Sequence, residues 1–328
     1  MTVTPINVGT EPTAITGITP VVAEVVKAAP PQQLTSAQAA DLALRYGLRP
    51  MGVRPPLKSY LQKLFKRRDL VWELADSSAY ARNQGSYLGQ AWAVLDPLLL
   101  AIFYVLVFGL LFPPGDSIKN IVGFITVGIF TYTFFQNGVL GGAGSILGQQ
   151  DLIRSHQFPR AVVPISIVIT EAIRFFPAML VMVFVTWAAR FLPVMEPVPL
   201  SWRWLLAIPA FLLLTTFVTG MAMLFARICA RAPDLRSVLP FFFSLLMLAS
   251  GSMFPISQFA NAFGETGLRL LTYQPMGVYL HLMRSALLNE PVAPVSGIMW
   301  LWGVIWAVAS IVIGFLFFWW AEASYGRE

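Results

Sequence analysis

The chain has 328 residues, of which 57% are hydrophobic and only 12% charged, and its formal net charge is +6. Soluble globular domains usually carry about twice that share of charged residues, so the composition excludes an ordinary soluble domain and indicates a membrane protein. The single cysteine, Cys229, excludes a disulfide framework and a cysteine-based zinc site.

Residues 1–30 contain no charged start followed by an apolar run, so we expect no secretory signal there. They are rich in Pro, Thr, Val and Ala, and they lack the long apolar segments that follow. We therefore expect domain 1–56 to be a mobile cytoplasmic tail.

Residues 57–82 predict an amphipathic helix. Lys58, Lys63, Lys66 and Arg67 share one side of it. Apolar residues recur at helical spacing on the other side, namely Leu57, Tyr60, Leu61, Leu64, Phe65, Val71, Trp72 and Ala75. This pattern is typical of a helix that lies in the inner membrane interface, and a helix packed on protein is the alternative.

Residues 83–328 predict an all-α membrane domain with six transmembrane helices. A spanning helix needs about 20 apolar residues, and the segments that reach or approach this length are 88–112, 121–146, 161–189, 204–226, 238–254 and 296–320. Glycines between positions 138 and 148 would let neighbouring helices approach closely. The apolar runs within 255–291 are too short to cross, so we expect a pair of short re-entrant helices at the outer face.

Basic residues gather on the N-terminal side, where nine Lys and Arg lie between residues 45 and 82. This cluster next to apolar segments suits a membrane surface better than a nucleic acid. By the positive-inside rule the N-terminus is cytoplasmic, and six spans return the C-terminus to the same side. We therefore expect a multi-pass protein of the inner or plasma membrane.

Motifs for catalysis are absent from the sequence. A phosphate-binding loop needs a Gly-Lys pair, and none of the five lysines follows a glycine. His156 and His281 are far apart and form no local metal motif. We therefore expect neither enzymatic activity nor a metal or cofactor in this chain.

Two ionisable residues lie within the third apolar segment. Glu171 and Arg174 are three residues apart and share one helix face. They form an intramembrane ion pair that satisfies itself, or one that braces a subunit interface or lines a conduit.

The loop between the second and third apolar segments combines apolar and charged residues. Pro159 and Pro164 stiffen it, because each disfavours helix at the residue before it. Its apolar members are Leu152, Ile153 and Phe158, and its charged members are Arg154 and Arg160. A rigid knob of this kind can seat in a groove of a cytoplasmic partner, whereas an ordinary charged connector is the alternative.

Three patches carry a recognisable pattern. The first joins Arg68-Asp69-Leu70 to Ser86, Leu88, Gly89, Trp92 and Pro97, the second is Phe158-Pro159-Arg160 with Pro164, and the third is Gln274-Pro275 with Arg284. In order and spacing over residues 60–325, they resemble the ABC-2 type polysaccharide export permeases. Gln84 stands where many members have Arg, which removes one gate charge or moves it to Arg82.

The resemblance implies a permease subunit that exports lipid-linked polysaccharide of the galactan, teichoic acid or O-antigen type. It implies a homodimer whose shared interface is the channel, with a separate ABC ATPase in two copies that binds ATP and Mg. It assigns ATPase coupling to Leu152, Ile153, Arg154, His156, Phe158, Pro159 and Arg160. It assigns an outer gate to Tyr273, Gln274, Pro275 and Arg284.

The amphipathic helix then suggests a gate for substrate entering from the inner leaflet. Its cations can hold an anionic pyrophosphate headgroup, and simple anchoring to anionic lipid is an equal alternative. The candidate gate residues are Lys63, Lys66, Arg67, Arg68, Trp72 and Arg82. Aromatic rings suit sugar cargo, because their flat faces stack on C–H groups. The candidate path residues are Tyr104, Phe108, Phe130, Tyr132, Phe134 and Phe135.

Three other functions stay open at this point. A permease of the same fold for drugs or small lipids would share most of these features. A membrane glycosyltransferase would need an acid cluster, and a passive channel or scaffold would need no ATPase.

Overall fold

The computed structural model describes residues 56–81, 85–111, 118–156, 158–191, 198, 201–288 and 290–322, and positions 35, 42, 45 and 46. Every regular element in these ranges is a helix, in agreement with the predicted all-α class. The chain divides into two units, Met1–Met51 and Gly52–Glu328, and the second is described below. The predicted tail, 1–56, lies almost wholly outside the described residues.

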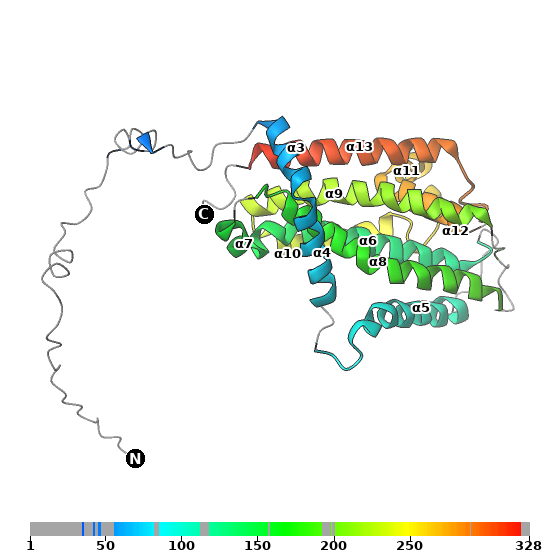
Figure 1. Cartoon of the computed structure of the whole chain (residues 1–328). Coiled ribbons are helices and arrows are strands. Elements are labelled where there is room, and N and C mark those ends of the chain that lie inside the picture. Colours follow the sequence, from blue (N-terminus) through cyan, green and yellow to red (C-terminus); the bar gives the residue numbers. More distant parts are fainter. Residues whose placement is uncertain are drawn as a thin grey trace, which may run out of the picture. The chain divides into compact units, whose positions relative to one another are not determined.

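Four long helices form the centre of the second unit. They are α6 (Ile121–Gly148), α8 (Val162–Ala188), α9 (Ala207–Arg231) and α13 (Gly297–Trp320). α6 packs against both α8 and α9, and α9 packs against α13 (Figure 1). Most residues of α6 are buried, so this helix is the core of the bundle.

Small residues bring these helices into close contact. A Cβ atom at Gly142 of α6 would overlap Ala222 of α9, and one at Gly220 of α9 would overlap the backbone of Ser310 in α13. Gly314 of α13 meets the backbone of Gly220 in the same way. The predicted close approach along the α6 glycines is therefore confirmed at Gly142, and α9 and α13 use the same device.

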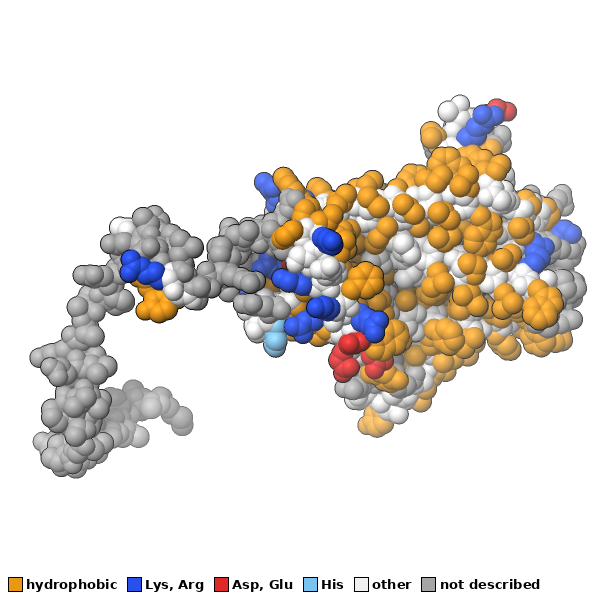
Figure 2. All heavy atoms as spheres, turned by 45° about the horizontal axis from the view of Figure 1, so that its top comes forward, with side chains coloured by type: hydrophobic (Ala, Val, Ile, Leu, Met, Phe, Trp, Pro, Cys, Tyr) orange, Lys and Arg blue, Asp and Glu red, His pale blue; other side chains and the backbone are white. Residues whose placement is uncertain are grey.

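Within the described ranges, three helical segments are long and apolar enough to cross a membrane, namely α8, α13 and α9 together with the preceding η3 (Trp202–Leu206). Two shorter apolar helical stretches are Trp92–Phe103, which is part of α5 (Trp92–Leu111), and α10 (Leu235–Ala249). Hydrophobic side chains cover much of the visible face of the helical body, while Lys and Arg gather toward its ends (Figure 2). Length and composition therefore support the third, fourth and sixth of the six predicted spans. The other three spans stay predictions.

Two helices, rather than the predicted single one, cover residues 57–81. α3 (Leu57–Lys66) and α4 (Arg68–Ala81) are separated at Arg67, and they run across the long helices (Figure 1). Like charges at i, i+4 destabilise a helix, and Lys63 and Arg67 stand at this spacing beside Lys66. Tyr60, Val71 and Ala75 are buried, so part of the apolar face packs on protein.

Two short helices lie between α10 and α13. They are α11 (Ala260–Tyr273) and α12 (Pro275–Leu287), preceded by η4 (Ile256–Phe259). Gly264, with a φ of 64°, interrupts α11, and Pro275 begins α12. The helical pair agrees with the sequence analysis, while its re-entrant position in a membrane stays a prediction. The remaining short elements are η1 (Gly89–Ala91), α7 (Gln150–Ser155) and η2 (Ala189–Phe191).

Candidate functional site

A cavity of about 570 Å³ opens between α4, α5, α6 and α8. Its wall includes Asp76 and Tyr80 of α4, Trp92 and Asp96 of α5, Phe130, Phe134 and Asn137 of α6, and Glu171 and Arg174 of α8. Aromatic faces and hydrogen-bonding groups thus line one space. This combination can bind a sugar, because rings stack on its C–H groups while carboxylates and amides bond its hydroxyls.

The α4 wall of the cavity is fixed to α8 by two hydrogen bonds. Thr170 Oγ1 shares its proton between the carbonyl of Ser166 in its own helix, at 2.9 Å, and the carbonyl of Ala75, at 3.2 Å. Arg174 Nη2 donates to the carbonyl of Ser78 at 3.2 Å. These bonds bracket the turn that carries Asp76. Thus α4 contributes to the cavity as a positioned element of the fold.

Glu171 and Arg174 form the ion pair that their spacing predicts, with 2.8 Å between Arg174 Nη1 and Glu171 Oε1. Their side chains are only 26% (Arg174) and 15% (Glu171) exposed, and both line the cavity. A second cavity of about 370 Å³ shares Asn137 and Glu171 and is also lined by Arg236 of α10. Polar groups of α6, α8 and α10 therefore continue from one cavity to the next.

The charge of the larger cavity is unbalanced. Among the residues that the structure describes, Asp76, Asp96 and Glu171 place three carboxylates on its wall, and Arg174 is the one cation there. Such a wall favours neutral hydroxyl groups over a pyrophosphate. Among the residues that the structure describes, no group of three His, Cys, Asp or Glu could hold a metal ion.

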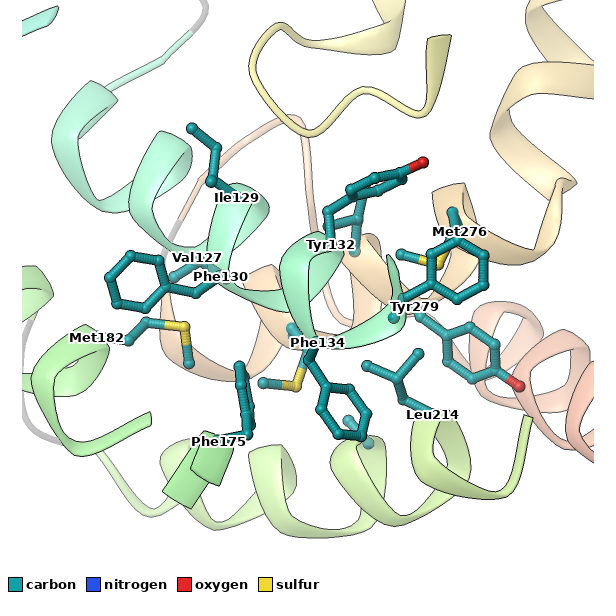
Figure 3. Close-up of a cluster of buried hydrophobic side chains, with 14 of the residues drawn as sticks. Val127, Ile129, Phe130, Tyr132, Phe134, Phe175, Met182, Leu214, Met276 and Tyr279 are labelled. Atoms are coloured by element: carbon teal, nitrogen blue, oxygen red, sulfur yellow. The ribbon is translucent and has the colours of Figure 1, made fainter. Parts of the chain in front are cut away.

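The predicted path aromatics separate into two sets. Phe130 and Phe134 are buried and also line the larger cavity. Tyr132 is buried in the core (Figure 3), where its Oη donates to the carbonyl of Phe243 at 2.6 Å. Phe135 is buried in the same core cluster. The side chains of the remaining candidates, Tyr104 and Phe108, lie outside the described part of the chain.

Trp92 and Asp96 are cavity residues that the sequence analysis did not select. Trp92 belongs to the motif that carries the family resemblance, and Asp96 directly precedes its Pro97, but neither was assigned a role. The available signal was Asp96-Pro97, a charge and a helix-breaking residue inside an otherwise apolar run.

The predicted gate residues that the structure describes do not line this cavity. Lys63, Lys66, Arg67, Arg68 and Trp72 are all exposed on α3, α4 and the break between them. Arg68 Nε lies 3.7 Å from Asp69 Oδ1, with both side chains almost fully exposed. Arg82 lies outside the described residues. The cations and the cavity are thus separate features of the α3–α4 surface.

The predicted coupling residues divide between an inner and an outer side. Ile153 and Pro159 are buried, Leu152 is half-buried, and Phe158 packs against a buried cluster that includes Tyr60 and Phe318. The residues on the exposed side are Arg154 and His156. The apolar part of the predicted knob therefore packs within the chain, and Arg154 and His156 are exposed.

The predicted outer-gate residues hold the short helices in place. Gln274 Nε2 donates to the carbonyl of Ala249 at 3.1 Å, and the carbonyl of Tyr273 accepts from Trp306 Nε1 at 3.0 Å. Pro275 occupies the first turn of α12, where a missing N–H costs nothing.

Arg284 is 5% exposed, and its guanidinium donates to three backbone carbonyls, those of Phe124, Gly251 and Ser252. The guanidinium carbon also lies 3.4 Å from the centre of the Phe124 ring. This side chain joins α12, α6 and the turn after α10.

Comparison with known proteins gives a consistent result. Residues 70–273 match the ABC-2 type transporter family. An O-antigen export system permease protein RfbA from Myxococcus xanthus is 26% identical over 259 residues, which cover 76% of this chain and 94% of that protein. A protein of the same description from Klebsiella pneumoniae is 26% identical over 252 residues, or 75% of this chain and 90% of the relative.

The family match spans well over half of the chain. It includes the first sequence patch from Leu70 onward and the whole second patch, and it ends at residue 273, directly before the third. It also contains most of the helices that line the larger cavity. The chain belongs to the ABC-2 type transporter family.

Proposed function

We propose that this chain is the transmembrane permease subunit of an ATP-driven exporter that moves lipid-linked polysaccharide to the outer side of the membrane. The observation that carries the proposal is the alignment with O-antigen export permeases over at least nine-tenths of the length of two relatives. An alignment of this extent leaves no large domain of those relatives without a counterpart here.

The energy for transport comes, in this proposal, from a separate ABC ATPase present in two copies. The family is one of ABC transporters, and the present sequence holds no Gly-Lys pair for a phosphate loop. ATP and Mg would bind the ATPase. The exposed Arg154 and His156 are the residues proposed to meet it.

The larger cavity is the proposed binding place for sugar units of the substrate. Trp92, Tyr80 and the Phe130 and Phe134 rings supply apolar faces, while Asp76 and Glu171 supply acceptors for hydroxyls. The anionic headgroup belongs elsewhere, because the cavity carries an excess of carboxylates. The exposed cations of α3 and α4 are the proposed place for it.

Six spans with both termini in the cytoplasm are the proposed topology. The 28 residues of α6 make it roughly 42 Å long at 1.5 Å per residue, enough to cross a hydrocarbon core of about 30 Å. The hydrogen bond between Tyr60 and Glu322 supports a common side for α3 and the end of α13.

A homodimer is the proposed assembly, because one small bundle is too narrow to enclose a polymer. The exposed apolar residues of α5 and of α10 are consistent with contact to a partner subunit or to lipid. They include Leu99, Ile102, Phe103, Val238, Phe241, Phe242 and Leu245.

Depletion of the chain in its own cells tests the proposal. We expect surface polysaccharide to disappear while its lipid-linked form accumulates on the cytoplasmic side. Affinity purification of the tagged chain from native membrane should recover an ABC ATPase with it. Normal surface polysaccharide after depletion, or a purified chain that hydrolyses ATP without a partner, would contradict the assignment.

Substitution of Trp92 tests the cavity. Trp92→Ala removes a half-buried ring from its wall, and we expect export to fall by roughly two- to tenfold, the range for losing one stacked ring. The amount of chain in the membrane should not change. Trp202→Ala is the matched control, because this Trp is 87% exposed on η3, away from the cavity. Equal effects of the two substitutions would exclude a specific role for Trp92.

A further inference from the structure

Three segments that are distant in sequence meet at one buried point. Tyr60 of α3 is 1% exposed, Ala161 just before α8 is fully buried, and Glu322 just after α13 is 8% exposed. Tyr60 thus comes from the N-terminal side of the helical unit, Ala161 from the connection into α8, and Glu322 from the C-terminal side of the unit. The sequence analysis gave no role to Glu322.

Hydrogen bonds connect the three segments into a closed network. Tyr60 Oη donates to Glu322 Oε2 at 2.9 Å and accepts from the N–H of Ala161 at 3.1 Å. The N–H of Arg160 donates to Glu322 Oε1 at 3.0 Å, and Arg160 Nη1 donates to the main-chain carbonyl of Glu322. Both carboxylate oxygens and the tyrosine hydroxyl are therefore used.

An apolar cluster surrounds this network. It includes Phe318 of α13, and Ile153 and Phe158 of the coupling segment, which we define as residues 150–161. Burial raises the pKa of the Glu322 carboxyl above its usual range, and the hydrogen bonds from Arg160 and Tyr60 oppose that shift. A buried carboxylate is costly unless it is hydrogen-bonded, so the two donors to it, Tyr60 Oη and the N–H of Arg160, are needed to keep it in place.

The network is the first of three attachments between the α3–α4 pair and the start of α8. Further along, Thr170 bonds the Ala75 carbonyl and Arg174 bonds the Ser78 carbonyl. The attachments follow one another in the same order on both segments. A displacement of residues 158–161 would therefore carry α3 and α4 with it, and α4 bears Asp76 and Tyr80 of the larger cavity.

We propose that Tyr60 and Glu322 are positioning residues that transmit movement of the coupling segment, residues 150–161, to the α4 wall of the cavity. The inference rests on the proposed function, because it attributes the movement to a partner ATPase. The buried hydrogen-bond network does not depend on that function. In this mechanism an ATPase that pushes on the exposed side of the segment changes the cavity through the Tyr60–Glu322–Arg160 network. Export then follows ATP hydrolysis only while the network is intact.

Tyr60→Phe is the sharpest variant, because it removes the hydroxyl and keeps the ring that packs 5.9 Å from Phe315. Glu322→Gln keeps the shape and removes the charge. Glu265→Gln is the matched control, since Glu265 is exposed on α11 and pairs only across 3.8 Å with the exposed Arg269. All variants are made in the full chain and purified with the ATPase that accompanies it.

Three quantities are measured, namely membrane abundance, ATP hydrolysis by the complex, and surface polysaccharide. We expect Tyr60→Phe and Glu322→Gln to lower polysaccharide export per ATP hydrolysed by at least about fivefold, the lower end for an unmet buried polar group. Abundance and ATP hydrolysis should stay near those of the original chain. The double variant should be no worse than the more severe single one, because the two residues act through one network.

Amide hydrogen exchange separates the two levels of the proposal. Tyr60→Phe should speed exchange of the Ala161 amide by at least about fivefold, because that N–H loses its acceptor. Faster exchange with unchanged export per ATP would overturn transmission and leave the exporter assignment intact. An export loss that follows abundance would also overturn it. If no ATPase accompanies the chain and depletion leaves surface polysaccharide unchanged, the proposed function itself fails.

Discussion

At the scale of single residues, Arg284 shows how an ionisable side chain in an apolar protein can be structural. Sequence reasoning placed it at an outer gate, and the structure shows its donors committed to the carbonyls of Phe124, Gly251 and Ser252. A gating residue must release its contacts during each cycle. Three simultaneous carbonyl bonds favour a role in fixing the turn after α10, with α12 and α6 as its supports.

Replacement of Arg284 by Lys tests that role. Lys has three donors on one nitrogen and cannot reach three separated carbonyls as a planar fork does. We expect Arg284→Lys to lower the free energy of unfolding by about 2 kcal/mol or more, because charge-assisted bonds are lost and buried carbonyls are left unpaired. Thermal denaturation of the purified protein in detergent measures this. Arg269→Lys, exposed on α11, serves as the control and should leave the midpoint unchanged.

At the scale of elements, the contact between α9 and α13 depends on the absence of side chains. Gly220 and Gly314 let the two backbones touch, and hydrophobic driving force is weak between helices surrounded by lipid. Close van der Waals packing is what holds such helices together. One added methyl group at this contact therefore has a larger effect than its size suggests.

Gly220→Ala is the corresponding test. The new Cβ would overlap the backbone of Ser310, which cannot rotate away as a side chain can. We expect overpacking to destabilise the protein by about 1–3 kcal/mol and to lower its yield from membranes. Gly148→Ala is the control, because no atom lies within 4 Å of a Cβ built there. A normal yield and melting temperature for Gly220→Ala would mean that the helices can separate without loss.

Residue patterns predicted the kinds of element better than their contacts. Apolar segments and the short pair after α10 were evident, because length and polarity are local properties. The break at Arg67 was missed, since the apolar positions continue in phase across it. The surroundings of α6 were hidden for another reason: this helix is apolar on all sides, so periodicity does not separate Phe134, at the cavity, from Phe135, in the core.

The partnership of Tyr60 with Glu322 lies beyond any local pattern. The two residues are 262 positions apart, and only the packing of α3 against the ends of α8 and α13 brings them together. Similarly, Asp96 stood out as a charge in an apolar run, but its neighbours on α4 and α8 could not be inferred. Candidate sites assembled from several helices require the fold itself.

At the scale of the whole molecule, the coupling segment has one side turned inward. Because Phe158 packs against the cluster around Tyr60, Phe158→Ala would combine a packing defect with any loss of docking. Arg154 is the cleaner probe, because it is exposed. Its position in α7 makes it one of the groups that an approaching partner would meet.

We expect Arg154→Glu to weaken association with the ATPase, because charge reversal at a docking surface costs affinity. Co-purification of the two proteins should fall by roughly fivefold or more at physiological salt, while the amount of the chain in the membrane stays the same. Arg231→Glu makes the same change at the exposed end of α9 and should have a smaller effect. Equal losses for the two variants would indicate a general charge effect and would remove the coupling segment from the interface.

The glycine contact between α9 and α13 has a consequence for how such a bundle can work. Because their backbones pack closely at Gly220 and Gly314, we expect these two helices to move together as one unit. α10 is different, because its Val238, Phe241 and Leu245 face outward. Under the proposed function, we therefore expect the transport path to open by movement of α10. We expect a small apolar inhibitor bound beside α10 to block transport. The contact between α9 and α13 leaves no space for such a molecule.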